Sequence, residues 1–318
     1  MSLIKNSKEL NKASLLVIAG PTASGKTALS LLLADLLDGE IVSADSLQIY
    51  KEFDIGSAKP DQKQLKRVRH HLVGVLSPEA EINAFEYSNM ARKAISDIVA
   101  RGKFPILVGG SGLYIRAAID GLLKVDGVFD GVKESILEEV RTKGLKSLYD
   151  ELLAADPETA LSIHSNDEMR IVRALELSRV THKTRKEIAG SAIPLDIGKI
   201  HFFSLNIERK DLYLRVNERV DKMLSSGLLK EVKAITDKYG FDVSPLGGLG
   251  YRQFAEYIKG TLTLERAVYL TKMETRHYAK RQITWFKKDK RVNWLDAKED
   301  TSLLLKKIID VLKDAPCQ

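Results

Sequence analysis

The segment Gly20–Thr27, with the sequence GPTASGKT, constrains the fold of this chain more than any other feature. It fits the phosphate-binding pattern GxxxxGK[ST] in full. An apolar run at Ser14–Ala19 precedes it and an apolar helical segment at Ala28–Leu37 follows, so the pattern stands between an expected strand and an expected helix. In that context main-chain N–H groups surround an anion, and the helix N-terminus adds partial positive charge. The chain is therefore predicted to form an α/β fold with a phosphate or diphosphate site.

The residues of this loop have different predicted roles. Gly20 and Gly25 let the main chain approach a phosphate group without a Cβ clash. Lys26 is expected to neutralise terminal phosphate oxygens, and Thr27 is expected to ligate Mg²⁺. A glycine-rich turn that merely precedes a helix is the alternative, and the strand–loop–helix context argues against it. The predicted diphosphate-binding residues are Gly20, Pro21, Thr22, Ala23, Ser24, Gly25, Lys26 and Thr27.

A carboxylate follows a different strand from the one that ordinary nucleotide hydrolases use. In those enzymes a second apolar strand ends in Asp and supports Mg²⁺, whereas Phe104–Val108 is followed here by Gly109–Gly112, which contains only the hydroxyl of Ser111. Asp45 instead follows the predicted strand Glu40–Ala44. Because ligands lie at the carboxyl ends of parallel strands, Asp45 is expected to face the ligand as a general base or a Mg²⁺ support. An acid that only caps a turn is an equally good interpretation.

Apolar spacing divides the chain into two kinds of structure. Alternating strand and helix signals up to about residue 110 predict a P-loop NTPase-like parallel sheet flanked by helices. From about residue 132 to residue 190 the signals are helical only, and strand and helix signals then return. The predicted organisation is a catalytic core of residues 1–121 and 200–318, interrupted by a helical insertion at 122–199. The predicted strands after the first are Glu40–Ala44, His71–Leu76, Phe104–Val108, Ile200–Leu205 and Val292–Leu295.

The charge balance is consistent with a polyanionic partner such as nucleic acid, since 50 Lys and Arg stand against 43 Asp and Glu, a net charge of +7. Arg276–Arg291 concentrates this charge and interleaves it with aromatic residues, as in segments that bind a nucleic-acid backbone and stack on bases. A solvated helix face is the simpler interpretation of such a run.

One cysteine, Cys317, excludes an internal disulfide and fits a reducing compartment. We expect a cytoplasmic protein with no membrane partner.

Two pairs of arginines share helix faces by their spacing. Arg170 and Arg173 are three residues apart, and Arg215 and Arg219 are four apart. An arginine that reaches the phosphate loop would stabilise charge on a departing phosphate group. Spacing alone does not select one of the four.

Taken together, a series of short segments resembles one enzyme family. In order along the chain these segments are GPTASGKT, SADSLQIY, DIGSAKP, VGGSGLYI, HSNDEMRIVRALE, LYLRVNERVDKML, GLGYRQ and KRQITWF. They resemble the tRNA dimethylallyltransferases (tRNA isopentenyltransferases) of bacterial type from Ala19 to about Trp294. The resemblance implies transfer of a dimethylallyl group from dimethylallyl diphosphate to N6 of the adenine 3′ of the anticodon. It also implies Mg²⁺ as cofactor, the tRNA anticodon loop as partner, and a monomer.

The resemblance also implies roles for individual residues. Asp45 would be the general base, and Ser46, Leu47 and Gln48 would help to hold the extruded base. Ser111 would lie beside the diphosphate or the reacting base, and Arg219 would stabilise the diphosphate. The residues implied to contact tRNA, besides those from Asp45 to Gln48, are Met169, Arg170, Ile171, Val172, Arg173, Gly247, Gly248, Leu249, Gly250, Tyr251, Arg252, Arg276, His277, Tyr278, Ala279, Lys280, Arg281, Gln282 and Ile283.

Two other classes of function remain as alternatives. An adenylate isopentenyltransferase or a small-molecule P-loop kinase would share the phosphate loop, but it has no need of a long basic surface or a helical insertion. A non-catalytic RNA-binding protein would use the loop only to bind an anion, and Asp45 and Arg219 would then be dispensable.

Overall fold

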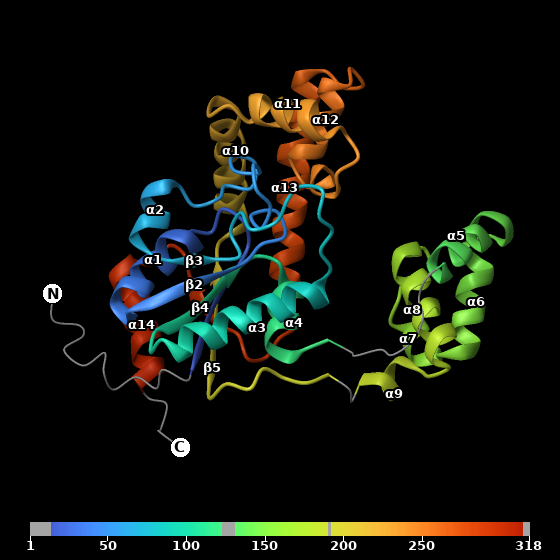
Figure 1. The fold of residues 1–318 in the computed structure, drawn as a ribbon, viewed down its shortest axis with the longest axis horizontal. Coiled ribbons are helices and arrows are strands. Elements are labelled where there is room, and N and C mark those ends of the chain that lie inside the picture. The colour runs from blue at the N-terminus through green and yellow to red at the C-terminus, as the bar shows by residue number, and fades with distance from the viewer. Residues whose placement is uncertain (1–13, 123–130, 190–191, 314–318) are drawn as a thin grey trace. The chain divides into compact units, whose positions relative to one another are not determined.

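The computed structural model describes residues 14–122, 131–189 and 192–313 (Figure 1). These residues form two compact units. The first lies within Met1–Ile119 and Leu195–Gln318, and the second within Asp120–Pro194. The sequence placed the division at residues 122 and 199.

The first unit is built on one six-stranded parallel sheet, which confirms the predicted α/β class. The strand order is β3-β2-β4-β1-β5-β6, so the strand before the phosphate loop lies near the centre. Residue pairing aligns Ala19 with Gly109 and with Ser204, and Gly109 with Ala44. The carboxyl ends of four strands are therefore level. The strands are β1 (Leu15–Ala19), β2 (Gly39–Ala44), β3 (His70–His71), β4 (Phe104–Gly109), β5 (Ile200–Asn206) and β6 (Asn293–Asp296).

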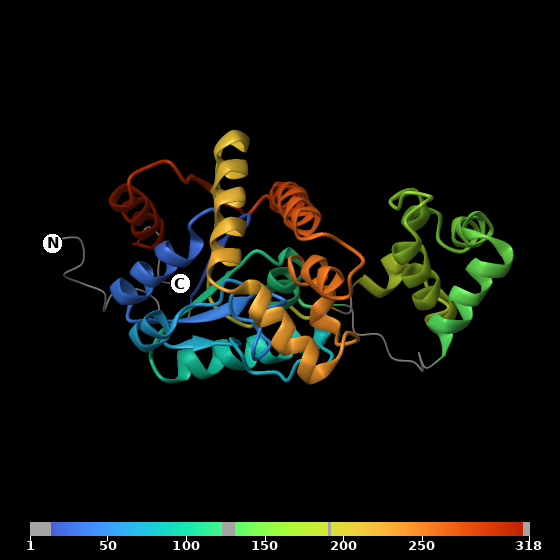
Figure 2. The ribbon, with the colours of Figure 1, turned by 90° about the horizontal axis from the view of Figure 1, so that it is seen from above.

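Helices cover both faces of this sheet (Figure 2). Side chains alternate along β1, so Leu16 and Ile18 pack against α1 (Lys26–Leu37) and α14 (Thr301–Lys313) on one face. Leu15 and Val17 face the opposite side, where they join the core formed with α3 (Ala84–Ala100) and α4 (Gly112–Asp120). A strand buried on both faces reads as a continuous apolar run, which explains the sequence of Leu15–Ala19.

The C-terminal helices of the first unit stand above the strand ends. They are α10 (Arg209–Ser225), α11 (Leu228–Tyr239), α12 (Tyr251–Ile258) and α13 (Leu264–Phe286), with a short 3₁₀ turn at Ser244–Gly247. α13 packs against both α10 and α12, and α12 packs against α11. A short α2 (Gln62–Arg67) precedes β3. This packing brings the segments GLGYRQ and KRQITWF, distant in sequence, to the carboxyl end of the sheet.

The second unit has its own helical core. It comprises α5 (Val132–Lys143), α6 (Leu145–Ala155), α7 (Pro157–Leu161), α8 (Glu168–Thr181) and α9 (Arg185–Ala189). Ile136, Leu152 and Ile171 are buried there. Arg179 on α8 joins α5 and α6 through Glu139 (2.6 Å) and Glu151 (2.8 Å).

One predicted strand is largely wrong. Of His71–Leu76, only the first residue belongs to a strand, β3, and Leu76 forms an isolated bridge with Tyr50. Leu72 and Gly74 both have φ near +61°, a left-handed conformation that interrupts an extended chain. In the part of the chain that the structure describes, no helix has the length and apolar character needed to cross a bilayer.

Candidate active site

The loop Gly20–Thr27 connects β1 to α1 in a conformation that needs glycine at two positions. Gly20 has φ of +139°, and a Cβ there would lie 3.1 Å from the carbonyl oxygen of Leu205. Gly25 has φ of +98° and forms the N-cap of α1. Inside the loop, the hydroxyl of Ser24 is buried and has no hydrogen-bond partner among the described residues. A buried donor left unpaired is costly, so this hydroxyl marks a place where a ligand oxygen would be stabilising.

Two cations at this loop, Lys26 and Arg219, lie close to each other and have no ion-pair partner among the described residues. Within the described parts of the chain, neither Lys26 nor Arg219 forms an ion pair, and the Lys26 ammonium donates instead to the carbonyl of Pro21 (2.6 Å). Burial and the neighbouring Arg219 lower the pKa of Lys26 to about 7, and Asp45 opposes that shift. Burial also lowers the pKa of Arg219, again opposed by Asp45. A polyanion at this place would neutralise both charges, and the helix N-terminus adds to the attraction.

Asp45 follows β2 and caps a turn, as one of its two interpretations from the sequence predicts, while its role as a general base stays a prediction. Its Oδ1 accepts the N–H groups of Leu47 (2.9 Å) and Gln48 (3.2 Å), so the carboxylate caps the turn after the strand. In the described structure Oδ2 has no hydrogen-bond partner, and Asp45 lines a cavity. One oxygen therefore fixes the carboxylate in place while the other is available to accept a proton.

The cavity has a volume of about 200 Å³ and mixed walls. Thr22, Asp45, Arg219 and Tyr278 supply polar groups. A space lined in this way fits a flat or branched organic group that must be aligned against a charged one. Its apolar walls come from Leu47, Val220, Met223, Leu228 and Leu249.

Helix α13 connects the phosphate loop to the turn after β4 through the side chain of Gln282. Gln282 is 5% exposed; its Oε1 accepts the N–H of Thr22 (2.9 Å) and its Nε2 donates to the carbonyl of Gly110 (3.0 Å). A Cβ on Gly110 would collide with this amide, and one on Gly112 would collide with the indole of Trp285. Gly110 and Gly112 of the GGSG turn are therefore needed for packing against α13.

Tyr278 lines the cavity, whereas Ser111 is not among the described residues that line it. Burial raises the pKa of Tyr278 to about 12, with Asp45 adding to the shift, and the phenol lies near Ser111 and Gln282. The N–H of Ser111 donates to the carbonyl of Ala44 (3.2 Å), directly before Asp45. The main chain of Ser111 is thus held at the strand end that leads into Asp45.

A model of the IPP transferase family matches residues 48–289. This chain belongs to the IPP transferase family. It is 41% identical over 305 residues to tRNA dimethylallyltransferase 2 of Geotalea uraniireducens, covering 94% of this chain and 97% of the relative. It is 40% identical over 291 residues to tRNA dimethylallyltransferase of Geobacter sulfurreducens, covering 90% of this chain and 93% of the relative.

Solved structures of IPP transferases give the same result. The tRNA delta(2)-isopentenylpyrophosphate transferase of Staphylococcus epidermidis superposes with a TM-score of 0.70 at 35% identity, over 95% of this chain and 99% of that one. A eukaryotic dimethylallyltransferase acting on tRNA superposes with a TM-score of 0.79 at 28% identity, over 95% of this chain and 80% of that one.

The residues that the sequence assigned to tRNA binding in this IPP transferase are of two kinds. Exposed side chains include Met169, Arg170, Arg173, His277, Lys280 and Arg281. Gly248, Leu249 and Gly250 line the cavity, and Gly247 is exposed beside them. Arg252 pairs with Glu274 (2.6 Å) and Arg276 donates to Asn217 (2.8 Å).

Most of the other assigned side chains are buried in the structure, whereas Tyr278, which lines the cavity, and Ile283 are partly buried. Ile171 and Val172 pack in the core of the second unit. Tyr251 and Ala279 are fully buried, Gln282 is engaged as described, and Ile283 packs partly buried beside Ala279. Helix periodicity places these side chains on the inner face of their helices, and the tRNA contacts assigned to their segments stay predictions.

Several functional positions were missed from the sequence. Thr271 and Thr275 line the cavity together with Tyr278. Their spacing of four and three residues on α13 is the signal that would have grouped them with Tyr278 on one face. Among the described residues there is no group of three or more His, Cys, Asp or Glu able to hold a metal. A divalent ion here would rest on the exposed Thr27 hydroxyl and on oxygens of the ligand itself, a donor set that suits Mg²⁺.

Proposed function

We propose that this chain transfers a dimethylallyl group from dimethylallyl diphosphate to N6 of the adenine that follows the anticodon of tRNA. The observation that carries the proposal is that Asp45 and Arg219 line one cavity and that Lys26 lies close enough to both to feel their charges, while neither cation forms an ion pair among the described residues. A diphosphate would neutralise the cations, and the carboxylate would face the incoming amine. Relatives about 40% identical are named tRNA dimethylallyltransferases, which supports the same substrates.

The reaction needs a base and a site for the leaving group. The lone pair of an exocyclic adenine amine is delocalised into the ring, so nitrogen attacks well only if its proton is accepted as the C–N bond forms. We assign that proton to Oδ2 of Asp45. As the allylic C–O bond breaks, the diphosphate gathers charge, which Lys26, Arg219 and the loop amides stabilise. Mg²⁺, held by Thr27 and diphosphate oxygens, would supply further charge neutralisation when bound.

The nucleobase must leave the stack of the anticodon loop to reach the cavity. Loop bases are the least costly to extrude, because they are not held in a duplex. We assign the exposed cations Lys280 and Arg281 on α13, and Arg170 and Arg173 of the helical insertion at 122–199, to the phosphate backbone of tRNA. We further propose a monomer acting in the cytoplasm, where tRNA is found.

The experiment compares acceptors. The protein is incubated with radiolabelled dimethylallyl diphosphate, Mg²⁺ and either an anticodon stem-loop transcript, the same transcript with guanine replacing the target adenine, or AMP. Label in the first transcript alone is the expected result. Label in AMP would support an adenylate isopentenyltransferase instead, and label in no acceptor would contradict the transferase assignment. An Asp45→Asn variant is the control for background transfer.

A further inference from the structure

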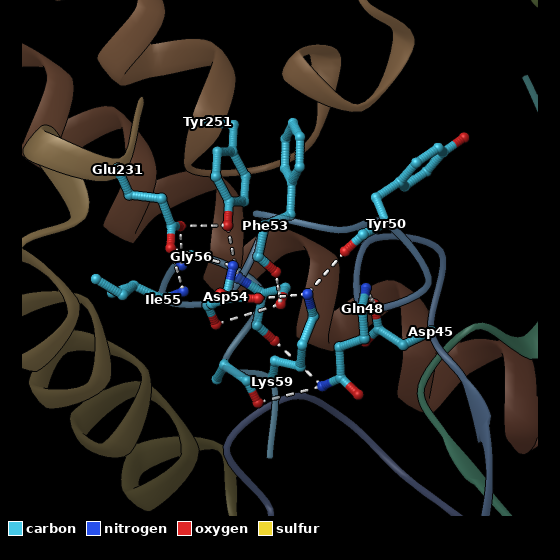
Figure 3. A network of polar contacts seen from close by, with 12 residues as sticks. Asp45, Gln48, Tyr50, Phe53, Asp54, Ile55, Gly56, Lys59, Glu231 and Tyr251 are labelled. Atoms are coloured by element: carbon cyan, nitrogen blue, oxygen red, sulfur yellow. Dashed lines mark hydrogen bonds and ion pairs between the residues drawn. The ribbon is translucent and has the colours of Figure 1, made fainter. Parts of the chain in front are cut away.

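A polar network lies beside the cavity and contains none of the groups assigned to the reaction step except Asp45 (Figure 3). Its centre is Glu231 on α11. Oε2 of Glu231 accepts the N–H groups of Asp54 (3.1 Å) and Ile55 (2.7 Å), and Oε1 accepts the N–H of Gly56 (3.1 Å). Three successive main-chain amides of one loop therefore converge on one carboxylate.

Tyr251 on α12 holds the same loop from a second direction. Its hydroxyl donates to Oε1 of Glu231 (2.6 Å) and accepts the N–H of Ser57 (3.2 Å). Its ring packs on Phe53 with centroids 4.5 Å apart. A Cβ on Gly56 would lie 2.6 Å from this ring, so the loop sits against Tyr251 as closely as glycine allows.

Gln48 ties the loop to the turn that carries Asp45. Its Nε2 donates to the carbonyls of Ser57 and Ala58 (3.2 Å each), and its Oε1 accepts the hydroxyl of Ser43 (3.1 Å). The side-chain amide of Gln48 is thus fully used within the protein, and Gln48 does not line the cavity. Ser46 and Leu47 line the cavity, whereas Gln48 supports its wall, and the expectation that Gln48 helps to hold the extruded base stays a prediction.

The loop held in this way forms part of the wall, through Gly56 and Ser57. In the proposed reaction the diphosphate would bind at the phosphate loop, and the attacking nitrogen would lie between Asp45 and the allylic carbon. The rest of the nucleobase would then extend away from the phosphate loop, along the wall to which Gly56 and Ser57 belong.

We propose that Glu231 and Tyr251, with Gln48, are positioning residues that fix the loop Asp54–Ala58 against Asp45 and so align the nucleobase. The inference rests on the proposed function. Among the described residues, no member of the network forms a hydrogen bond with the phosphate loop. The inference therefore predicts that the network affects the tRNA substrate and not the diphosphate. A network that only stabilised the fold would change both substrates alike, through the fraction of protein folded.

The test measures kcat and KM for each substrate separately in Glu231→Ala, Glu231→Gln and Tyr251→Phe. For Glu231→Ala we expect kcat/KM for the anticodon stem-loop to fall about tenfold to a hundredfold, since displacements near 1 Å have that effect, while KM for dimethylallyl diphosphate stays within about twofold. In Glu231→Gln, kcat/KM for the anticodon stem-loop should fall less, because the amide oxygen still accepts the N–H groups of Asp54 and Ile55. Tyr251→Phe removes one hydroxyl only and remains informative if Glu231→Ala does not fold.

Asp237→Asn on the same helix is the matched control, since Asp237 is exposed and Lys233 is its one ion-pair partner among the residues that the structure describes. Hydrogen exchange of the peptide that contains residues 54–58 should quicken in Glu231→Ala and Tyr251→Phe, and stay unchanged in Asp237→Asn. If the wild type transfers the group and both Glu231→Ala and Tyr251→Phe keep its kinetic constants for tRNA, the inference is overturned while the proposed function stands. No transfer by the wild type to any acceptor would overturn the proposed function and the inference together.

Discussion

Replacing Gln282 by alanine should loosen the phosphate loop and destabilise the first unit. The change leaves the N–H of Thr22 and the carbonyl of Gly110 without their partner. The first hydrogen bond is part-buried and the second is buried. Each buried group left unpaired costs about 1–3 kcal/mol, so a loss of about 3 kcal/mol is expected for the pair. Because 1 kcal/mol corresponds to roughly 2–4 °C in a domain of this size, Tm should fall by about 6–12 °C.

The same variant should bind inorganic diphosphate more weakly. Without Gln282 the phosphate loop is no longer held at Thr22, and a cost of about 1.4 kcal/mol for ordering it on binding lowers the affinity about tenfold. Thermal unfolding followed by circular dichroism and titration calorimetry with diphosphate measure the two effects. Lys280→Ala, an exposed position two residues away, is the control and should stay within about 0.5 kcal/mol of wild type. The reasoning is refuted if Gln282→Ala melts within 2 °C of wild type, on the scale of roughly 2–4 °C per kcal/mol, and binds diphosphate equally well.

Three further outcomes are expected. Asp45→Asn keeps the Oδ1 acceptor for Leu47 and Gln48 but loses the proton acceptor, so single-turnover transfer should slow about 10²–10⁴-fold with diphosphate binding intact; a rate within tenfold of wild type argues against a general base. Diphosphate requires charged Lys26, whose pKa in the free protein is about 7, so binding at pH 8 should take up a proton; calorimetry in two buffers of different ionisation enthalpy detects this, and Lys26→Met should abolish it. Thr271→Val replaces a buried hydroxyl that has no partner among the described residues, and should stabilise the protein by about 1 kcal/mol in urea denaturation; a loss of stability would contradict the assignment.

The sequence predicted elements well where apolar spacing alone decides them. The strand Leu15–Ala19 is buried on both faces, and helix Ala84–Ala100 presents one apolar stripe, so each shows its period directly. The strand expected at His71–Leu76 is wrong because apolar composition does not reveal the left-handed conformation of Leu72. Backbone conformation at a non-glycine residue leaves little trace in composition.

The candidate site divides in the same way. Lys26 and Asp45 were found because their contacts are local, within one loop and one strand end. Gln282 and Glu231 were not assigned their positions because their partners lie 260 and 175–177 residues away in sequence. Both lie in charged helices that read as solvent-exposed, and only the packing of α11 and α13 shows which polar side chain turns inward.

The bond between Thr22 and Gln282 has a consequence for how the chain is made. Residues 20–27 leave the ribosome early, yet the amide of Thr22 has its partner only after α13 has been synthesised, 260 residues later. The GGSG turn likewise meets Gln282 and Trp285 only then. A nascent chain therefore contains a complete phosphate-binding sequence before α13 can hold the phosphate loop in place. The enzyme can adopt its active conformation only near the end of translation.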